Sequence, residues 1–215
     1  MKLYELTINE FLQRVDSPTP TPGGGSVSAL AIVQGISLIR MVGHLTISKK
    51  KFNELSENVK LDYMSRISAL DEIKLEVLEL IDKDTNAFND IMASYKLPKV
   101  TDEEKKYRTE QINLATIHAT EVPLQTAKLA YKSLELAEPT FVYANKSATS
   151  DFGVGINLIH AGLNGAIFNV KTNMHEFADI EISRKYYQEV EELEKNANII
   201  LKRLIEAVNS EFLLN

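Results

Sequence analysis

The chain has 215 residues, 44% of them hydrophobic and 25% charged, a composition typical of one globular domain with a sizeable core. Its net charge of −6 argues against a general nucleic-acid binder, which would carry a basic face, and the absence of cysteine excludes disulfides, thiolate metal sites and a cysteine nucleophile. The amino terminus lacks the apolar core of a signal peptide, and the two uncharged stretches are short or contain polar residues. We therefore expect a cytoplasmic protein that binds neither nucleic acid nor membrane.

Near the amino terminus, Pro-Thr-Pro-Gly-Gly-Gly-Ser at residues 20–26 is followed by a stretch from Val27 to Ile39 without a charged side chain. Consecutive glycines let backbone N–H groups turn toward an anion, and Ser26 is expected to cap the helix that follows, whose dipole adds to the attraction. The segment alone also fits a flexible linker. The prediction is a nest for a carboxylate or phosphate built from Gly23, Gly24, Gly25 and Ser26.

Apolar residues recur with helical spacing in the rest of the chain, and no segment alternates convincingly with the period of a strand. Prolines at positions 18, 20 and 22 end a short first helix, and Leu97-Pro98-Lys99 ends a long one that follows Lys51. The sequence predicts an all-α fold in a single domain, residues 1–215.

The second half of the chain continues this helical pattern. Thr101 is expected to cap a further helix, and Pro123 falls inside its apolar pattern and should kink it. Glu138-Pro139 should close that helix, and residues 140–150 are predicted to form a polar loop.

All nine glycines fall in two windows, five in 23–43 and four in 153–165, which are also the segments poorest in charge. Glycine inside a helix costs about 1 kcal/mol relative to alanine, so this clustering points to a close approach of backbones. We expect two glycine-rich helices at the centre of a bundle, packed on each other or on a symmetry mate. A merely well-packed core is the alternative.

In the long helix, Asp84 is in register with the apolar stripe, four residues from both Leu80 and Phe88. A carboxylate on such a face must be paired, hydrogen-bonded or used, because burying it alone is costly. Catalytic use, a structural ion pair and a stripe that turns toward solvent remain open at this point. Asp82 lies on a neighbouring face.

The segment 151–177 has one apolar face and one face of small and amide-bearing residues. The second face carries Asp151, Asn169 and Asn173 beside glycines, which suits a flat heterocycle rich in N–H and C=O groups. A helix cap by Asp151 and structural hydrogen bonds by the two asparagines are the alternatives.

Several cations and histidines complete the candidate residues. Lys49-Lys50-Lys51 is either a solvated run of charges or a surface that attracts a polyanionic tail. Lys99 and Arg108 add positive charge farther along the chain. The four histidines show no metal-ligand spacing, so no metal site is expected. His44 is the better acid–base candidate among them.

Taken in order, these segments resemble the formimidoyltetrahydrofolate cyclodeaminase/cyclohydrolase family over about residues 5–180. One departure is Ala144-Asn145, where the pattern expects Gly-Asn. The motifs that carry the resemblance include Pro22-Gly23-Gly24-Gly25-Ser26-Val27, Asp82-x-Asp84-x-x-Ala87-Phe88, Leu97-Pro98-Lys99, Ser150-Asp151 and Gly165-Ala166-x-Phe168-Asn169-Val170-x-x-Asn173.

The resemblance implies an all-helical homodimer that acts on folates without a metal or organic cofactor. It implies conversion of 5-formimidoyltetrahydrofolate to 5,10-methenyltetrahydrofolate, in which N10 attacks the formimidoyl carbon and ammonia leaves. Asp84 and Asp151 would be the carboxylates for proton transfer and pterin binding, and His44 a further catalytic candidate. Binding residues would be Gly23, Gly24, Gly25, Ser26, Asp82, Arg108, Asn145, Asn169 and Asn173, with Lys49, Lys50 and Lys99 steering a polyglutamate tail.

Two alternatives stay open. The first is a methenyltetrahydrofolate cyclohydrolase, in which water opens the same ring to 10-formyltetrahydrofolate. The second, from another class, is a non-catalytic helical dimer that binds a folate or a protein partner.

Overall fold

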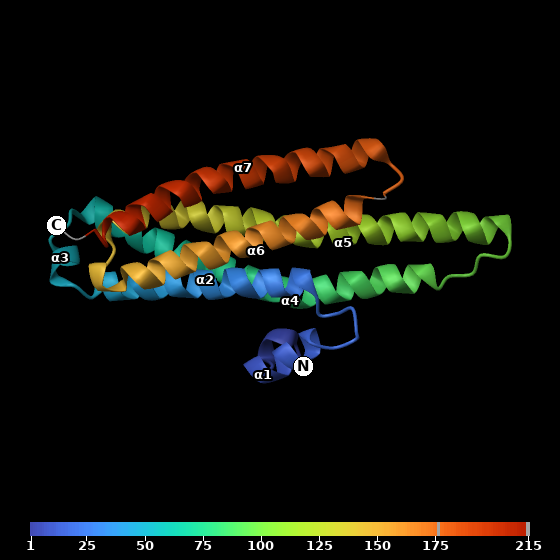
Figure 1. Cartoon of the computed structure of the whole chain (residues 1–215), viewed down its shortest axis with the longest axis horizontal. Helices are drawn as coiled ribbons and strands as arrows, with labels where there is room; N and C mark the ends of the chain where they lie inside the picture. The colour runs from blue at the N-terminus through green and yellow to red at the C-terminus, as the bar shows by residue number, and fades with distance from the viewer. Residues whose placement is uncertain (176, 214–215) are drawn as a thin grey trace.

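The protein is described by a computed structural model that covers residues 1–175 and 177–213, and within these ranges it contains helices and no strand. This confirms the all-α prediction. The bundle is elongated, and its long axis runs parallel to its helices (Figure 1). Its five long helices are α2 (Gly24–Ile47), α4 (Glu57–Tyr95), α5 (Asp102–Ala137), α6 (Thr149–His175) and α7 (Ile180–Ser210).

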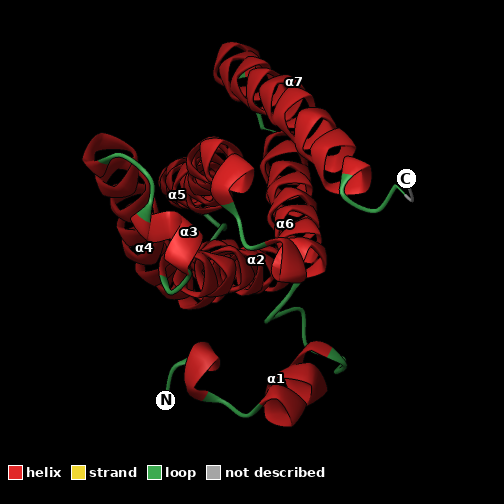
Figure 2. Ribbon diagram, turned by 90° about the vertical axis from the view of Figure 1, so that its left-hand side faces the viewer, coloured by secondary structure: helices red, strands yellow, loops and turns green. Residues whose placement is uncertain are grey.

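Shorter elements connect and flank these helices. The amino-terminal segment contains a 3₁₀ turn η1 (Leu3–Glu5) and helix α1 (Ile8–Val15), which stand beside the bundle (Figure 2). Helix α3 (Lys50–Asn53) follows α2, and two 3₁₀ turns, η2 (Glu138–Tyr143) and η3 (Lys146–Ala148), join α5 to α6.

The prediction of a polar loop at 140–150 is wrong. Its residues form 3₁₀ turns, and α6 already begins at Thr149. The physical reason is burial: Phe141 is only 7% exposed and its ring centroid lies 4.9 Å from that of Phe152 in α6. An aromatic side chain packed in this way holds the connection against the bundle.

At the centre, α2 and α6 run antiparallel with their backbones in contact. A Cβ atom added to Gly35 would lie 2.5 Å from the carbonyl oxygen of Gly155, and one added to Gly162 would lie 2.5 Å from the carbonyl oxygen of Ser28. No side chain fits at these crossings. The prediction of two central glycine-rich helices is therefore confirmed.

Helices α4 and α5 form a long antiparallel hairpin that packs on α2 and α6 (Figures 1 and 2). Thr101 caps α5 as predicted: its hydroxyl accepts from the Glu104 N–H, and the Glu104 carboxylate accepts from the Thr101 N–H in return. Helix α5 continues through Pro123 to Ala137.

Helix α2 is the one described helix long and apolar enough to cross a membrane by length and composition, and 56% of its apolar window is buried in the protein. It packs against α4 on one side and α6 on the other. Its apolar residues thus serve the core of the bundle.

Candidate functional site

The amino-terminal turn of α2 meets the middle of α4 at Asp84. The backbone N–H of Ser26 donates to Oδ2 of Asp84 at 2.9 Å, and the Ser26 hydroxyl lies 3.0 Å from the same oxygen. Gly23 is the N-cap and Ser26 lies inside the helix, so the prediction that Ser26 caps α2 is wrong. Asp84 takes the capping role from across the helix interface, because a carboxylate satisfies a free N–H at a helix N-terminus and complements its dipole.

In the predicted anion nest, the backbone N–H of Ser26 thus binds a carboxylate of the protein itself. Gly25 makes this possible: a Cβ atom there would lie 2.0 Å from Oδ1 of Asp84 and 2.4 Å from its Cγ. The glycine run lets an acid from α4 lie directly on the backbone of α2.

Two opposing effects set the protonation of Asp84. Burial raises the pKa of its carboxyl, and the hydrogen bonds from the Ser26 hydroxyl and N–H lower it; burial is the larger effect, so the pKa lies above its usual range. Both hydrogen bonds go to Oδ2, and none of the described residues donates to Oδ1. Asp84 thus has one anchored oxygen and one free oxygen, which suits a general acid or base.

A cleft of about 870 Å³ opens one helical turn beyond Asp84, where Phe88 lines it. It lies between the outer ends of α4 and α5 and the carboxyl end of α6, and its volume is in the range of ligand sites. Five aromatic rings and two asparagine amides face it, which suits a flat heteroaromatic ligand with amide-like edges. The lining residues are Phe88, Ile91, Met92, Tyr95, Ile112, Asn113, Thr116, Phe168, Lys171, Thr172, Asn173, His175, Phe177, Ala178 and Tyr187.

The two predicted asparagines lie beside this cleft. Asn173 lines it and donates from Nδ2 to the Ala119 carbonyl oxygen at 3.0 Å, so its own carbonyl oxygen stays available to a ligand. Asn169 lies one turn earlier, next to Gly24, and donates to the Gly165 carbonyl oxygen at 2.8 Å. These contacts place both asparagines within about one helical turn of the Asp84 cluster or its cleft.

Arg108 lies at the outer end of the α4–α5 hairpin. Its Nη2 donates to the Tyr95 carbonyl oxygen at 3.0 Å, and its guanidinium lies 5.4 Å from the centroid of the Tyr95 ring. Tyr95 lines the cleft, so Arg108 borders the site through that ring. Lys99 is exposed in the connection between the two helices.

Asp151 lies at the opposite end of the bundle. Asn169, beside Gly24, is eighteen residues farther along α6, which corresponds to about 27 Å at 1.5 Å per residue. His44 is exposed and lies about 28 Å along α2 from Gly25 by the same measure. A single chain therefore does not bring Asp151 or His44 to Asp84, because the antiparallel helices carry them to the far end.

That far end has a cleft of its own, of about 600 Å³. Asn145 belongs to it and donates from its backbone N–H to Oγ1 of Thr46 at 2.9 Å. The structure thus brings Asn145 together with Lys49 and Lys50, and separates these lysines from Lys99. The lining residues are Thr46, Lys49, Lys50, Lys51, Phe52, Leu55, Val142, Tyr143, Ala144, Asn145 and Lys146.

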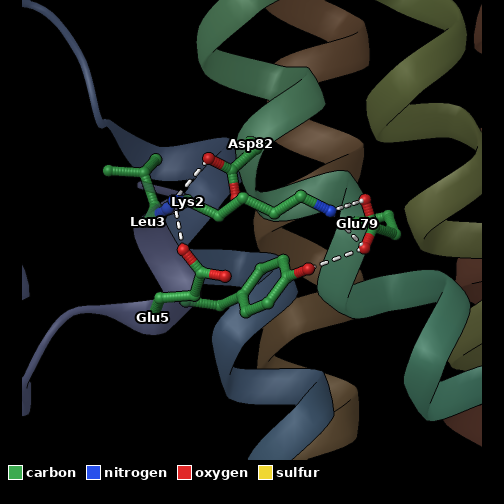
Figure 3. A network of polar contacts seen from close by, with 6 residues as sticks. Lys2, Leu3, Glu5, Glu79 and Asp82 are labelled. Atoms are coloured by element: carbon green, nitrogen blue, oxygen red, sulfur yellow. Dashed lines mark hydrogen bonds and ion pairs between the residues drawn. The ribbon is translucent and has the colours of Figure 1, made fainter.

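Asp82, a predicted substrate-binding residue, holds the amino-terminal segment (Figure 3). Its Oδ1 accepts from the Leu3 N–H at 2.8 Å, and one turn earlier on α4 Glu79 binds the Lys2 ammonium at 2.7 Å. Residues two apart on a helix point to different faces, so Asp82 does not share the environment of Asp84.

Sequence reasoning missed most of the cleft lining. Phe88 and Phe168 stand in the motifs that carry the family resemblance, but nothing in the helical spacing of an aromatic residue separates a cleft-lining ring from a core ring. No group of three His, Asp or Glu side chains in residues 1–175 and 177–213 is arranged to hold a metal ion.

Comparison with known proteins gives a consistent result. The family model described as formiminotransferase-cyclodeaminase matches residues 7–192. The methenyltetrahydrofolate cyclohydrolase of Methylorubrum extorquens is 35% identical over 205 residues, which cover 95% of this chain and 97% of the relative. The formimidoyltransferase-cyclodeaminase of Rattus norvegicus is 28% identical, with 91% of this chain matching 35% of that protein.

A solved structure, formiminotetrahydrofolate cyclodeaminase from Thermotoga maritima, superimposes with a TM-score of 0.86 at 25% identity and covers 99% of this chain and all of its own. The similarity thus extends over the whole bundle, including the α2–α4 junction that carries Asp84. The chain belongs to the formiminotransferase-cyclodeaminase family.

Proposed function

We propose that the protein is a folate one-carbon enzyme that closes 5-formimidoyltetrahydrofolate to 5,10-methenyltetrahydrofolate with release of ammonia. The observation that carries this proposal is Asp84: a part-buried carboxylate with one free oxygen, next to a cleft lined by aromatic rings and amides. Membership in the family supports folate one-carbon chemistry, and the aromatic cleft suits a flat ligand such as a pterin.

The reaction asks for positioning and proton transfer. N10 of the substrate attacks the formimidoyl carbon on N5, the new bond closes a five-membered ring, and the amino nitrogen leaves with a proton. Aromatic rings in the cleft hold the pterin so that N10 reaches that carbon, which is catalysis by orientation. Asp84 accepts the N10 proton and returns a proton to the leaving nitrogen through Oδ1.

Substitution of Asp84 by Asn tests this role, because Asn preserves the shape and the contact to Ser26 but cannot carry a proton. Turnover should fall by about 100-fold or more, measured as the appearance of the methenyl absorbance and of ammonia. Asp90→Asn, at an exposed position of the same helix, is the matched control and should leave turnover unchanged. Normal turnover by Asp84→Asn would remove the carboxylate from the mechanism.

A second candidate is hydrolysis of 5,10-methenyltetrahydrofolate to 10-formyltetrahydrofolate. It is favoured by the relative of that name, which aligns over nearly its whole length. Incubation of purified protein with each folate separates the two activities: the methenyl absorbance rises with ammonia release in one case and falls without ammonia in the other. Folate binding without either change would favour the non-catalytic alternative.

The proposed enzyme acts as a homodimer through one uncharged face formed by α2 and α6. The residues of each helix recur at alternating intervals of three and four, the spacing with which one helix packs on another. A face without charge that carries exposed large apolar side chains is suited to a second copy of itself. The face consists of Val27, Ala31, Gln34, Leu38, Met41 and Leu45 on α2 and Val154, Leu158, Ala161, Gly165 and Phe168 on α6.

An antiparallel arrangement of two copies on this face would complete the site. It would lay the Asp151 end of one chain beside the Asp84 end of its partner, and with it the cleft that contains Lys49 and Lys50. Phe168 supports this geometry, because it belongs both to the uncharged face and to the cleft near Asp84. The lysines of one copy would then meet a polyglutamate tail on substrate held by the other.

Complementation tests the shared site. Light scattering should give the mass of a dimer, and Asp84→Asn and Asp151→Asn should each be inactive alone. When the two variants are mixed under conditions that exchange subunits, half of the dimers are mixed and each contains one intact site, so about a quarter of the activity should return. No recovery between exchanged subunits would contradict a site shared across the interface.

The cytoplasmic location of the protein stays a prediction.

A further inference from the structure

We propose that Ser26 is the positioning residue of the Asp84 site: it anchors Oδ2, leaves Oδ1 to meet the substrate, and accommodates both protonation states of the carboxyl. The inference rests on the proposed function in one respect, the assignment of Oδ1 to proton exchange. Its geometry is independent of which folate reaction the enzyme performs.

The first step of the argument is the anchoring of one oxygen. Oδ2 of Asp84 receives the Ser26 N–H at 2.9 Å and lies 3.0 Å from its hydroxyl, and Ser26 is 0% exposed. On the other side of the carboxylate, the backbone of Gly25 lies so close that a Cβ there would be 2.0 Å from Oδ1. Held by two donors and by this contact, the carboxylate has one orientation, with Oδ1 as its free atom.

The second step concerns the single hydrogen of the Ser26 hydroxyl. It has two acceptors within reach, Oδ2 of Asp84 at 3.0 Å and the Ile81 carbonyl oxygen at 2.8 Å. A hydroxyl can donate only one hydrogen at a time. When Asp84 is ionised, the hydrogen turns to the carboxylate; when Asp84 carries a proton, the hydrogen turns to Ile81.

Because it has two acceptors, the buried Ser26 hydroxyl keeps a hydrogen bond in both protonation states of Asp84. Thr85 Oγ1 lies 3.3 Å from the Ser26 hydroxyl and is a further hydrogen-bond partner for it. An unsatisfied buried polar group is costly, and a hydroxyl with one acceptor would favour only one of the two protonation states. Ser26 therefore stabilises the ionised carboxylate without leaving its own hydroxyl unpaired when the proton returns.

Among residues 1–175 and 177–213, no charged side chain forms a hydrogen bond or ion pair with Asp84 in place of Ser26. The first turn of α2 carries no charge, and on α4 Asp82 is engaged with Leu3 while Lys83 is exposed. On the facing helices, Lys171 of α6 pairs with Glu194, Glu121 of α5 accepts from Tyr186, and His118 is exposed. Glu10 and Arg14 of α1 line, with Thr85, a separate hollow beside the site. Within the part of the chain that the structure describes, burial and the two Ser26 hydrogen bonds are the causes that shift the pKa of Asp84.

The test is the titration of the Asp84 carboxyl carbon by ¹³C NMR in the full chain, assigned with Asp84→Asn. Ser26→Ala removes the hydroxyl and keeps the N–H, so the pKa of Asp84 should rise by about one unit or more, the loss of one hydrogen bond to a charged group. Ser28→Ala is the matched control: it removes a buried hydroxyl two residues on, whose partner is the Gly24 carbonyl oxygen. It should leave that pKa unchanged.

Kinetics give the second readout. In Ser26→Ala, kcat should fall with little change in KM, and the acidic limb of the pH–rate profile should move upward with the pKa of Asp84. Ser26→Cys, which keeps a weaker donor at the same place, should shift the pKa in the same direction by less, and serves if the alanine variant does not fold.

The possible results separate the inference from the function. An Asp84 pKa that is the same in Ser26→Ala, Ser28→Ala and the unsubstituted protein would overturn the positioning role. A raised pKa in Ser26→Ala together with normal turnover of Asp84→Asn would support the contact between the two residues and overturn the catalytic assignment of Asp84.

Discussion

The contact between Gly25 and Asp84 predicts that a single methyl group at Gly25 disables the site while the bundle still folds. In Gly25→Ala the new Cβ would lie 2.0 Å from Oδ1 and 2.4 Å from Cγ of Asp84, where ordinary contact begins at 3.4 Å. The carboxylate must therefore retreat by about 1.4 Å relative to α2, the difference between contact and overlap. Its hydrogen bonds to Ser26, at 2.9 and 3.0 Å, cannot both survive this movement.

The expected magnitudes follow from these distances. A displacement of about 1 Å at a catalytic group can cost about 100-fold in rate, so kcat should fall by about that factor. Loss of one hydrogen bond to a charged group costs about 1.5–3 kcal/mol, and alanine returns about 1 kcal/mol over glycine within a helix. The free energy of unfolding should therefore fall by about 0.5–2 kcal/mol, which leaves the domain folded.

The assay pairs turnover, followed by the methenyl absorbance, with denaturant unfolding of the same preparations. Gly24→Ala is the matched control, since its Cβ would meet Nδ2 of Asn169 at 3.6 Å, an ordinary contact. It should keep its fold and is the control for the unfolding measurement. If Gly25→Ala were as active as the unsubstituted protein, the placement of Asp84 against the α2 backbone would be refuted.

Four further outcomes are expected. Gly162→Ala should lower the free energy of unfolding, measured in urea, by about 1–3 kcal/mol, because its Cβ would meet the Ser28 carbonyl oxygen at 2.5 Å. In the control Gly153→Ala the new Cβ meets a methyl group at 3.2 Å, so the free energy of unfolding should change less. Thr101→Ala should lower it by about 1 kcal/mol through loss of the cap of α5, seen as a lower Tm. The pKa of Asp84 is raised in the folded state, so the stability that its proton confers is complete below the unfolded pKa of 3.8 and is lost as pH rises through the folded pKa. Asp84→Asn should therefore be more stable than the unsubstituted protein at neutral pH and lose this advantage in acid. Unfolding measured at several pH values tests this. Lys49→Ala combined with Lys50→Ala should raise KM for a polyglutamylated folate and leave KM for the monoglutamate unchanged, and an equal change in both would contradict the tail-binding role.

Much of the fold could be predicted because it depends on local rules. The helical period, the proline breakers and the Thr101 cap each act within a few residues, so the sequence carries them directly. The clustering of glycine in two windows also predicted the central helix pair, because glycine within a helix is costly unless a neighbouring backbone needs the space. The connection at 140–150 was misjudged, since its polar composition does not reveal that Phe141 packs on α6.

The candidate site, too, could be predicted only where it depends on local rules. Asp84 could be singled out because a charge in register with an apolar stripe conflicts with burial, and such a conflict is visible in the sequence. Its partner could not: Ser26 lies 58 positions away, and only the packing of α2 on α4 brings the two together. The glycine run predicted a nest for a substrate anion, which stays a prediction; in the structure the Ser26 N–H of this segment binds the Asp84 side chain.

By itself, the sequence determined the helical class, the helix boundaries set by proline and capping residues, the central glycine pair and the acid that breaks the pattern. Only the tertiary structure decided which residues share a site: it joined Asp84 to Gly25 and Ser26, opened the aromatic cleft beside them, and carried Asp151, His44 and the lysine run to the other end. The physical reason is that helical periodicity specifies which face a residue occupies. The distance between residues on different helices depends on the register and direction in which those helices pack, which no local pattern encodes.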